Sequence, residues 1–350
     1  DRLATEGILF DNAYAAAAPP ECIQNLCEQS LQQVAGYDLD SVSAHAATLI
    51  RAKLDVANDT PVHFISGGTQ ANLTVIGALL RPHEAVIAVD AGHIATHETG
   101  GMEATGHEVI HVPQVNGKLT PAAIEQVMRA HPHPKEHSVK PRMAFISQAT
   151  ELGTVYNRTE LLALRAVCDA HGLWLYIDGA RLGSALRSVH ADCDWQDIAR
   201  VADVFYIGGT KNGALLGEAI VFPNTTLNND FRYALKQRGA LLAKGRVIAS
   251  QFIALFEHDL YSELAQHAND CAIRLRMGLS ELGVVFYTDS ATNQQFPILP
   301  NTVIKALQKD YGFYTWEVLN ERESVVRFVF SWATPMAMVD EFLTNAKRLL

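Results

Sequence analysis

A regular alternation between residues 62 and 208 is the feature that most constrains the fold. Six apolar runs of five or six residues are separated by helix-like stretches or turn signals. The runs are "VHFIS", "AVIAV", "EVIHV", "RMAFIS", "LWLYID" and "DVFYIG". Such runs are typical of buried strands, and strands that alternate with helices form parallel sheets. We therefore predict an α/β fold whose sheet is mostly parallel and covered by helices.

The stretches between these runs carry helix start and stop signals. Residues 69–80, "TQANLTVIGALL", have apolar side chains at helical spacing, and Arg81-Pro82 is expected to stop this helix. A second helix is expected to open with Thr120 as its N-cap and Pro121 at its first position. Pattern and punctuation thus agree.

The pattern changes after about residue 225. Three long helices are expected first, and strands follow at 284–288, 295–299 and 325–332 before a closing helix. We therefore predict two domains. Residues 1–250 form the N-terminal segment and a large ligand-binding domain, and residues 251–350 form a small α+β domain.

Composition excludes several classes of partner. With 38 acidic and 28 basic residues, the formal charge of −10 offers no basic footprint for nucleic acid or a membrane, so a small-molecule partner is favoured. No apolar run reaches the roughly 18 residues that span a bilayer. The first residues lack the pattern of a signal peptide, and the five cysteines show no CxxC spacing. We expect a cytoplasmic protein.

Ligands of parallel α/β sheets bind beyond the carboxyl ends of the strands, so polar residues there are the candidates for a site. In "FISGGTQANL", a strand ends at Ser66, Gly67 and Gly68 leave backbone amides uncovered, and Thr69 opens a helix. Free amides at a helix N-terminus favour a phosphate group. An ordinary glycine-rich turn is the alternative, and the segment is neither GxGxxG nor a Walker loop.

A carboxylate and a lysine follow two further strands. Asp178 ends a strand in "LYIDGARL", where it either pairs locally with Arg181 or holds a proton on a heterocyclic nitrogen. Lys211 follows a strand that closes with residues 208–210, whose small side chains leave room for a planar group on the lysine nitrogen. Burial makes such an amine nucleophilic toward aldehydes. The alternative is a lysine that reaches the surface.

Histidines occur in two places. His93 follows a strand, and His97 comes four residues later without a glutamate at the general-base position of a zinc motif. An imidazole stacked on a planar ligand and a structural histidine are both compatible with His93. His131, His133 and His137 lie in a proline-containing loop, which we interpret as solvated. We expect no metal site.

These groups together match the four handles of pyridoxal phosphate. The cofactor has a phosphate, a ring nitrogen that needs a carboxylate, a flat face and an aldehyde that needs a lysine. The order of the segments along the chain also fits this cofactor.

Six segments in order resemble the low-specificity threonine aldolase and β-eliminating lyase family over nearly the whole chain. They are "SGGTQANL", "AGHIATHETGG", "ATELGTVY", "DGARLGSAL", "IGGTKNGALLGEAIVF" and "VVRFVFSWAT". The resemblance implies an aspartate-aminotransferase-like fold and a homodimer or homotetramer with sites at the subunit boundary. It also implies cleavage of β-hydroxy-α-amino acids, such as threonine or allo-threonine, to glycine and an aldehyde. A β-eliminating lyase or an aminotransferase is the close alternative, and a pyridoxal-free binding protein for sugar phosphates or nucleotides is the remote one.

The resemblance assigns roles to individual residues. Lys211 matches the Schiff-base lysine, Asp178 the aspartate at the pyridinium nitrogen, and His93 the ring-stacking histidine. The other assignments are the phosphate turn at Gly67, Gly68 and Thr69, the substrate-carboxylate arginines Arg181 and Arg327, and Arg238 as the base that reaches a neighbouring subunit's phosphate. Lys236, Lys244 and Arg246 compete with Arg238 for that role, and an ion pair with Glu321 or Glu323 is the alternative for Arg327.

Two departures from the family pattern bear on catalysis. Phe10 precedes Asp11 where many members have a serine, so a hydroxyl contact to the substrate carboxylate is expected to be missing. Glu151 stands where some members have a histidine that faces the substrate hydroxyl. Glu151 is therefore the candidate catalytic residue at this position, and the identity of the general base stays open.

Overall fold

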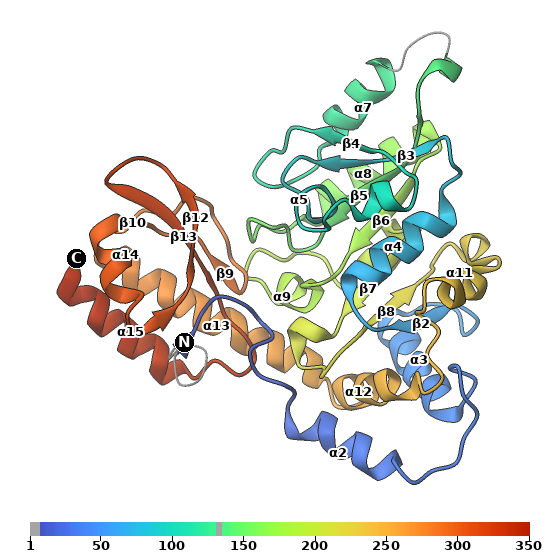
Figure 1. Cartoon of the computed structure of the whole chain (residues 1–350), viewed down its shortest axis with the longest axis horizontal. Coiled ribbons are helices and arrows are strands. Elements are labelled where there is room, and N and C mark those ends of the chain that lie inside the picture. Colours follow the sequence, from blue (N-terminus) through green and yellow to red (C-terminus); the bar gives the residue numbers. More distant parts are fainter. Residues whose placement is uncertain (1–7, 131–134) are drawn as a thin grey trace.

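The computed structural model describes residues 8–130 and 135–350, and two sheets organise it (Figure 1). The larger sheet has seven strands, in the spatial order β2 (Val62–Ile65), β8 (Glu218–Val221), β7 (Val204–Gly208), β6 (Trp174–Asp178), β5 (Lys140–Ser147), β3 (Glu84–Val89) and β4 (Val109–Val112). The ladder from β7 to β4 is parallel, and β8 runs antiparallel between β2 and β7. All six predicted strands are present, and the predicted mostly parallel α/β sheet is confirmed.

Helices cover both faces of this sheet, because successive strand residues point to opposite sides. In β7, Val204 and Tyr206 enter one core, whereas Phe205 and Ile207 enter the other. The first core includes residues of α4 (Gly68–Leu79), α5 (His93–Thr96), α6 (Gly101–Ala104) and α11 (Phe231–Gln237). The second includes residues of α3 (Ser41–Leu54), α7 (Pro121–Ala130), α8 (Arg158–His171), α9 (Leu182–Leu186), α10 (Trp195–Val201) and α12 (Arg246–Glu257). Burial on both faces explains why the strands read as continuous apolar runs.

The predicted helix signals are confirmed. α4 ends at Leu79, just before Arg81-Pro82. α7 begins at Pro121, and the backbone N–H of Ala123 donates to Thr120 Oγ1 at 3.2 Å, as expected of an N-cap. Short 3-10 helices are η1 (Lys135–His137), η2 (Thr210–Asn212) and η3 (Thr225–Asn228). Of the histidine loop, His137 ends η1, whereas His131 and His133 lie outside the described residues.

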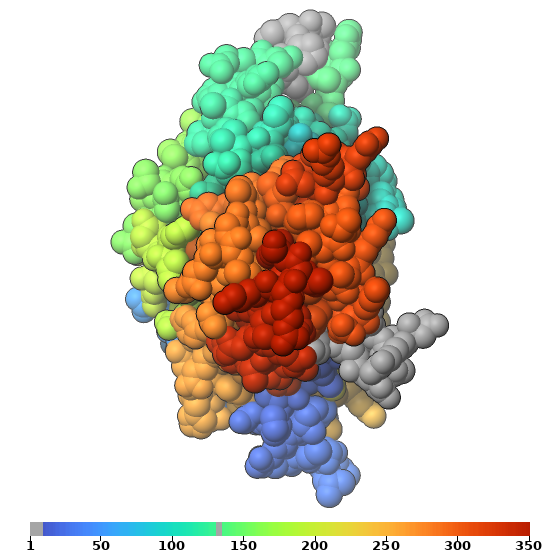
Figure 2. All heavy atoms as spheres, turned by 90° about the vertical axis from the view of Figure 1, so that its left-hand side faces the viewer, coloured from blue at the N-terminus to red at the C-terminus, as the bar shows by residue number. Residues whose placement is uncertain are grey.

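The smaller sheet is antiparallel and lies in the C-terminal region. Its strands are β10 (Ile298–Pro300), β13 (Glu323–Val329), β12 (Tyr314–Val318) and β9 (Gln294–Gln295), and α13 (Leu260–Glu281), α14 (Asn301–Leu307) and α15 (Met336–Leu349) accompany them. The strand predicted at 284–288 is wrong, because this half-exposed segment makes a single bridge, from Phe286 to Pro297. β12 was missed, since its side chains are mostly exposed and leave no apolar pattern. Figure 2 looks onto the side of the molecule that carries the small domain, and the C-terminal residues of α15 face the viewer there.

The start of the described chain packs on the small domain. β1 (Ile8–Leu9) pairs in parallel with β11 (Tyr311–Gly312), and the ring of Phe10 is fully buried between Phe328 and Phe342. α12, which contains residue 250, packs on α2 (Pro20–Gln29) and on α3. We therefore propose that residues 8–10 belong with the small domain and that the boundary between the domains follows α12.

Two observations concern the cellular setting of the chain. No helix within residues 8–130 and 135–350 is both long enough and apolar enough to cross a membrane. All five cysteines are free thiols, and Cys27 alone among them is exposed.

Candidate active site

The predicted site residues converge at the carboxyl ends of neighbouring strands. Asp178 ends β6, Lys211 lies in η2 directly after β7, and Glu151 follows the end of β5. His93 begins α5 after the end of β3. The pKa values of His93, Glu151 and Lys211 each respond to the charges of other residues in this group, as expected of side chains that share one site.

The predicted phosphate turn lies at the N-terminus of α4. Gly67 is the N-cap, and a Cβ added there would meet nothing within 4 Å. A hollow of about 450 Å³ lies at this turn, and its lining is Ser66, Gly67, Gly68, Thr69, Gln70, Leu73 and Arg238. At Gly68, by contrast, a side chain is excluded, because a Cβ there would lie 2.8 Å from the Tyr206 hydroxyl oxygen. Unpaired amides at the start of a three-turn helix suit a phosphate group.

Asp178 is held by neutral donors. Its Oδ1 accepts hydrogen bonds from the Tyr206 hydroxyl and from the Ala180 backbone N–H, the latter at 2.9 Å. Its Oδ2 has a longer contact of 3.4 Å from Asn72 Nδ2. The alternative of a local ion pair with Arg181 is wrong, since Arg181 pairs with Glu151. A buried carboxylate with one weakly bonded oxygen fits a protonated ring nitrogen, which would offset the cost of burial.

His93 is oriented by a buried carboxylate. Its Nδ1 lies 2.8 Å from Glu98 Oε1, and Asn72 Nδ2 donates to the same oxygen at 3.1 Å. Burial alone would lower the pKa of His93, but the hydrogen bond to Glu98 and the charges of Asp178 and Glu151 raise it above its ordinary value. The ring stacks on that of His97, with centroids 5.6 Å apart. A fixed imidazole plane of this kind can cover a flat ligand.

The amine of Lys211 is tuned toward reactivity. Burial and the positive charge of Arg181 lower its pKa to about 8, so a neutral, nucleophilic fraction exists near neutral pH. The glycines before Lys211 are required for a different reason from the one predicted. A Cβ on Gly208 would lie 2.5 Å from the Ala180 carbonyl oxygen, and one on Gly209 would lie 2.6 Å from that of Gly217. Backbone packing, rather than room for a planar group, therefore requires glycine there.

Glu218 is a candidate that sequence reasoning missed. Its Oε2 accepts a hydrogen bond of 2.6 Å from the Gly209 backbone N–H, behind Lys211. Burial raises the pKa of Glu218 to about 7, although this hydrogen bond and the charge of Lys211 oppose the shift. Its signal was a carboxylate at the start of the apolar strand "EAIVF".

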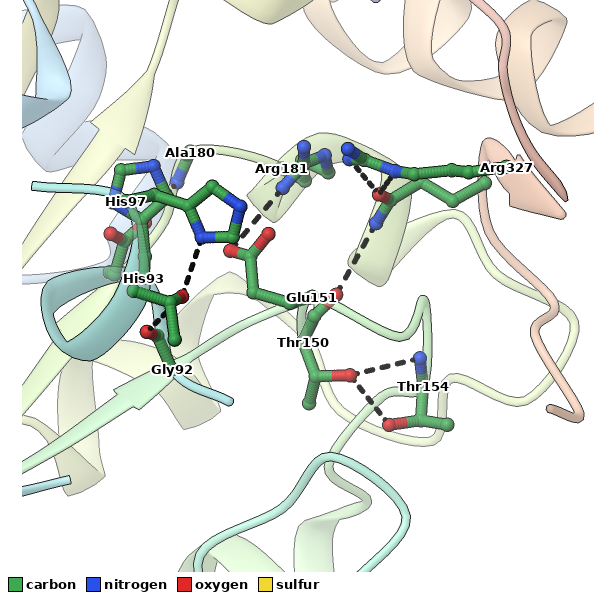
Figure 3. Close-up of polar contacts among 12 residues, drawn as sticks. Gly92, His93, His97, Thr150, Glu151, Thr154, Ala180, Arg181 and Arg327 are labelled. Atoms are coloured by element: carbon green, nitrogen blue, oxygen red, sulfur yellow. Dashed lines mark hydrogen bonds and ion pairs between the residues drawn. The ribbon is translucent and has the colours of Figure 1, made fainter. Parts of the chain in front are cut away.

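Glu151 and Arg181 form a buried ion pair in the centre of the site (Figure 3). Arg181 Nη1 lies 3.7 Å from Glu151 Oε1. Burial alone would raise the pKa of Glu151, but Arg181, His93 and Lys211 lower it to about 2, so the carboxylate is ionised. Arg181 Nε is buried without a hydrogen-bond partner in the described structure. Such a donor is available to a ligand.

Arg327 reaches the site from the small domain. Its Nε donates to Gln294 Oε1 at 3.0 Å, Nη2 donates to the same oxygen, and Nη1 donates to the Tyr314 hydroxyl. The alternative of an ion pair with Glu321 or Glu323 is wrong, because both are exposed and Arg327 makes no ion pair in the described structure. Burial and the charge of Arg181 lower the pKa of Arg327. Two buried guanidinium groups thus share the site, and the carboxylate of Glu151 pairs with one of them, Arg181.

Arg238 lines the hollow at the phosphate turn, and its backbone carbonyl accepts a hydrogen bond from Gln70 Nε2 at 3.2 Å, but its guanidinium lies elsewhere. The Arg238 guanidinium lies beside Gly77, where a Cβ would be 2.7 Å from Nη2. At 1.5 Å per residue, Gly77 is roughly 15 Å along α4 from the phosphate turn. The assignment of Arg238 to a neighbouring subunit's phosphate stays a prediction. The ring of Phe10 points into the small-domain core, so its position offers no contact to a ligand.

Comparison with known proteins identifies the fold and the family of this chain. The fold is aspartate-aminotransferase-like, since the aspartate aminotransferase of Thermus thermophilus aligns with a TM-score of 0.67 over 100% of this chain and 93% of its own, at 15% identity. Residues 32–301 match the β-eliminating lyase family. The chain therefore belongs to the β-eliminating lyase family, whose members depend on pyridoxal phosphate.

Relatives of the chain narrow the comparison further. A low-specificity L-threonine aldolase of Pseudomonas aeruginosa is 33% identical over 95% of this chain and 94% of its own length. Another, from a Pseudomonas species, is 34% identical over 90% of each. The structure of a threonine aldolase of Leishmania major is 44% identical and aligns with a TM-score of 0.95 over 98% of this chain and 99% of its own. The expected family resemblance is confirmed.

Proposed function

We propose that this chain cleaves β-hydroxy-α-amino acids, such as threonine or allo-threonine, to glycine and an aldehyde. The observation that carries the proposal is the meeting of Lys211, with its lowered pKa, and two buried guanidinium groups, Arg181 and Arg327. A lysine of this kind bonds to an aldehyde, and two cations beside it suit an amino acid's carboxylate. The relatives called threonine aldolases, 33 to 44% identical over nearly the whole chain, support this choice.

The described residues fit pyridoxal phosphate. The N-terminus of α4 would hold its phosphate, Asp178 Oδ2 its ring nitrogen, the His93 ring its face, and Lys211 its aldehyde carbon. When bound, the cofactor takes up the electron pair released as the Cα–Cβ bond breaks. The family assignment removes the pyridoxal-free alternative considered above.

The substrate carboxylate belongs between Arg181 and Arg327. Arg181 offers its unpartnered Nε, and Arg327 offers the N–H groups that Gln294 and Tyr314 leave free. A planar guanidinium matches a carboxylate in a two-point contact, which a lysine cannot make. Orientation by these two groups decides which bond at Cα breaks.

Replacing Arg327 with Lys is expected to lower kcat/KM for threonine roughly tenfold to hundredfold, because a charge-assisted contact contributes about 1.5 to 3 kcal/mol. Steady-state kinetics measures this loss. Cofactor occupancy should not change, since Arg327 is not among the residues that line the hollow at the phosphate turn. A variant with normal kcat/KM, or one that loses the cofactor absorbance, contradicts the carboxylate assignment.

The proton of the substrate hydroxyl needs an acceptor, and we assign two residues to it. Glu151 is a weak base at a pKa of about 2, so it orients the hydroxyl by accepting its hydrogen bond. His97 lies beside His93, and burial together with the nearby cations lowers its pKa, so its ring is neutral and able to accept a proton near pH 7 (Figure 3). Thr96 Oγ1 lies 2.6 Å from His97 Nδ1 and fixes the ring.

A pH profile tests the assignment to His97. Burial lowers the pKa of His97 from its ordinary value, so the wild-type rate should fall only at a pH below that ordinary value, where the ring becomes protonated. In His97→Phe, kcat should fall about a hundredfold, as for loss of a general base, and this acid limb should disappear. A variant that keeps the same acid limb shows that another group accepts the proton.

We propose that at least two chains assemble. Large hydrophobic side chains are exposed between residues 14 and 39 and on α11, at Tyr14, Leu31, Tyr37, Leu39 and Tyr233. Lys236 lies 4.6 Å over the Tyr37 ring and joins these two regions. An exposed apolar patch of this kind is typical of an interface. Sedimentation velocity should give a dimer or tetramer at assay concentrations, and an active monomer would contradict the proposal.

A reducing, cytoplasmic setting is also proposed, because all five cysteines are free thiols. Fractionation of the source cells should place the protein with cytoplasmic markers, and recovery from an oxidising compartment would argue against it.

The activity itself is tested by one assay. Purified protein with added pyridoxal phosphate is mixed with threonine, allo-threonine or phenylserine, and the release of aldehyde and of ammonia is followed separately. We expect aldehyde and glycine. Ammonia without glycine indicates a β-eliminating lyase, and a keto-acid requirement indicates an aminotransferase.

A further inference from the structure

A fully buried glutamine joins the two sides of the site. Gln294 lies in β9 of the small domain and is 0% exposed. Its Oε1 accepts hydrogen bonds from Arg327 Nε at 3.0 Å and from Nη2. Its Nε2 donates at 3.3 Å to the carbonyl oxygen of Thr150, the residue before Glu151. One side chain therefore holds a guanidinium of one domain and the loop of another.

The partners of Arg327 are all neutral in the described structure. A guanidinium has five donors, and the Gln294 amide and the Tyr314 hydroxyl accept from its three nitrogens. Neutral acceptors fix the direction of the group but form no ion pair with it within the described residues, although the charge of the more distant Glu151 acts on its pKa. The rings of Tyr314 and Trp316 lie 5.7 and 5.5 Å from its central carbon and add a second neutral support.

The contact between the small domain and the loop that carries Glu151, called the seam below, has a second attachment that does not involve Arg327. Ser290 Oγ and Thr292 Oγ1 both donate to the carbonyl oxygen of Gly153, at 3.0 and 3.1 Å. Gly153 has a φ of +73°, and a Cβ there would lie 2.2 Å from Ser290 Oγ. The loop that carries Glu151 is thus fixed to the small domain at two points, and the Gln294 point alone reaches Arg327.

We propose that Gln294 is a positioning residue that aims Arg327 at the ligand and makes the site selective for substrates with a free α-carboxylate. The inference rests on the proposed function, because it takes the ligand to be an amino acid. A carboxylic side chain at this place would neutralise Arg327 from within the protein. The amide instead leaves the guanidinium charge to the ligand, and its second hydrogen bond keeps Glu151 in register with that contact.

Gln294→Glu tests the inference, because it keeps the size of the side chain and adds a counter-ion for Arg327. Calorimetry on the holoenzyme gives the dissociation constants of glycine and of glycinamide, which lacks the carboxylate. We expect glycine to bind at least tenfold more weakly, which is the size of a lost charge-assisted contact, and glycinamide to bind within twofold of wild type. In kinetics, KM for threonine should rise more than kcat falls.

Gln294→Met removes both hydrogen bonds at similar volume and serves where the first variant does not fold. The ratio of glycine to glycinamide affinity should fall at least fivefold, and kcat should also fall, because the Thr150 contact is lost. An unchanged ratio in either variant overturns the proposal.

The neighbouring glutamine provides a matched control. Gln295 is also 0% exposed, donates to the carbonyl oxygens of Ser290 and Thr292 at 3.1 and 3.3 Å, and accepts from Arg276 Nη1 at 3.3 Å. Gln295→Glu should bind glycine within twofold of wild type. An equal loss in this control means that disturbance of the seam, rather than Arg327, sets glycine affinity, and the proposal fails.

The proposed activity fails in a different way. The wild-type protein could bind glycine, and the Gln294 variants could weaken that binding as expected, while the wild type cleaves no β-hydroxy-α-amino acid. That outcome contradicts the aldolase proposal and supports the carboxylate selectivity.

Discussion

We expect Lys211→Ala to abolish turnover and to leave pyridoxal phosphate bound without a covalent link. The lysine nitrogen is the proposed nucleophile, and burial together with the charge of Arg181 lowers its pKa to about 8. Among the described residues that directly follow β6 and β7, at 179–194 and 209–217, Lys211 is the one lysine. Removal of the nucleophile should lower kcat below detection, a loss of at least about 10⁴-fold on the scale seen for nucleophiles in other enzymes.

Borohydride fixation and peptide mapping give a direct readout for this variant. In the wild type, reduction should fix the cofactor on the peptide that contains Lys211, and Lys211→Ala should yield no such adduct. Lys305→Ala is the control, because Lys305 is an exposed lysine of α14 to which no role in the site is assigned. A wild-type protein that stays colourless with added cofactor, or an adduct on a different lysine, contradicts the assignment.

The fold was predictable where burial fixes the sequence pattern. The strands of the large sheet are covered on both faces, so each reads as an apolar run whatever its neighbours are. β12 escaped prediction because its residues are mostly exposed, and the packing of Phe10 on the small domain depends on a contact with residues some 300 positions away along the chain. Pairing between distant segments leaves no local signal.

The charged residues of the site were predictable because a charge at the end of an apolar strand is conspicuous. Asp178 and Lys211 both stand out in this way. The neutral side chains that hold the charged groups of the site could not be predicted. Tyr206, Asn72 and Gln294 are common residue types, and their roles come from tertiary hydrogen bonds. A neutral side chain that orients a charge has no spacing rule to reveal it.

The partner of Arg181 shows the same limit. Proximity in sequence favoured Asp178, three residues away, but the structure gives it Glu151, thirty residues earlier. β5 and β6 are neighbours in the sheet, so the loop after β5 reaches the turn after β6. Sheet order, rather than sequence distance, decided the ion pair.

Asp178→Asn is expected to lower kcat for threonine roughly a hundredfold to a thousandfold. The carbonyl oxygen of the new amide can still accept from the Tyr206 hydroxyl and the Ala180 N–H, so the side chain should stay in place. Its other end becomes a donor that faces the Asn72 amide group and the proposed ring nitrogen. Breaking a buried charge pair typically costs about 3 to 5 kcal/mol, which sets the expected range.

Tyr206→Phe separates the charge of Asp178 from its orientation. This variant removes the hydroxyl that donates to Asp178 Oδ1 but keeps the carboxylate, so kcat should fall clearly less than in Asp178→Asn. The pH dependence of the cofactor absorbance gives an independent readout, because Asp178→Asn alone should let the ring nitrogen lose its proton near neutral pH. If Asp178→Asn keeps kcat within tenfold of wild type, or if both variants lose the same amount, the carboxylate acts by packing and its charge is not what the site requires.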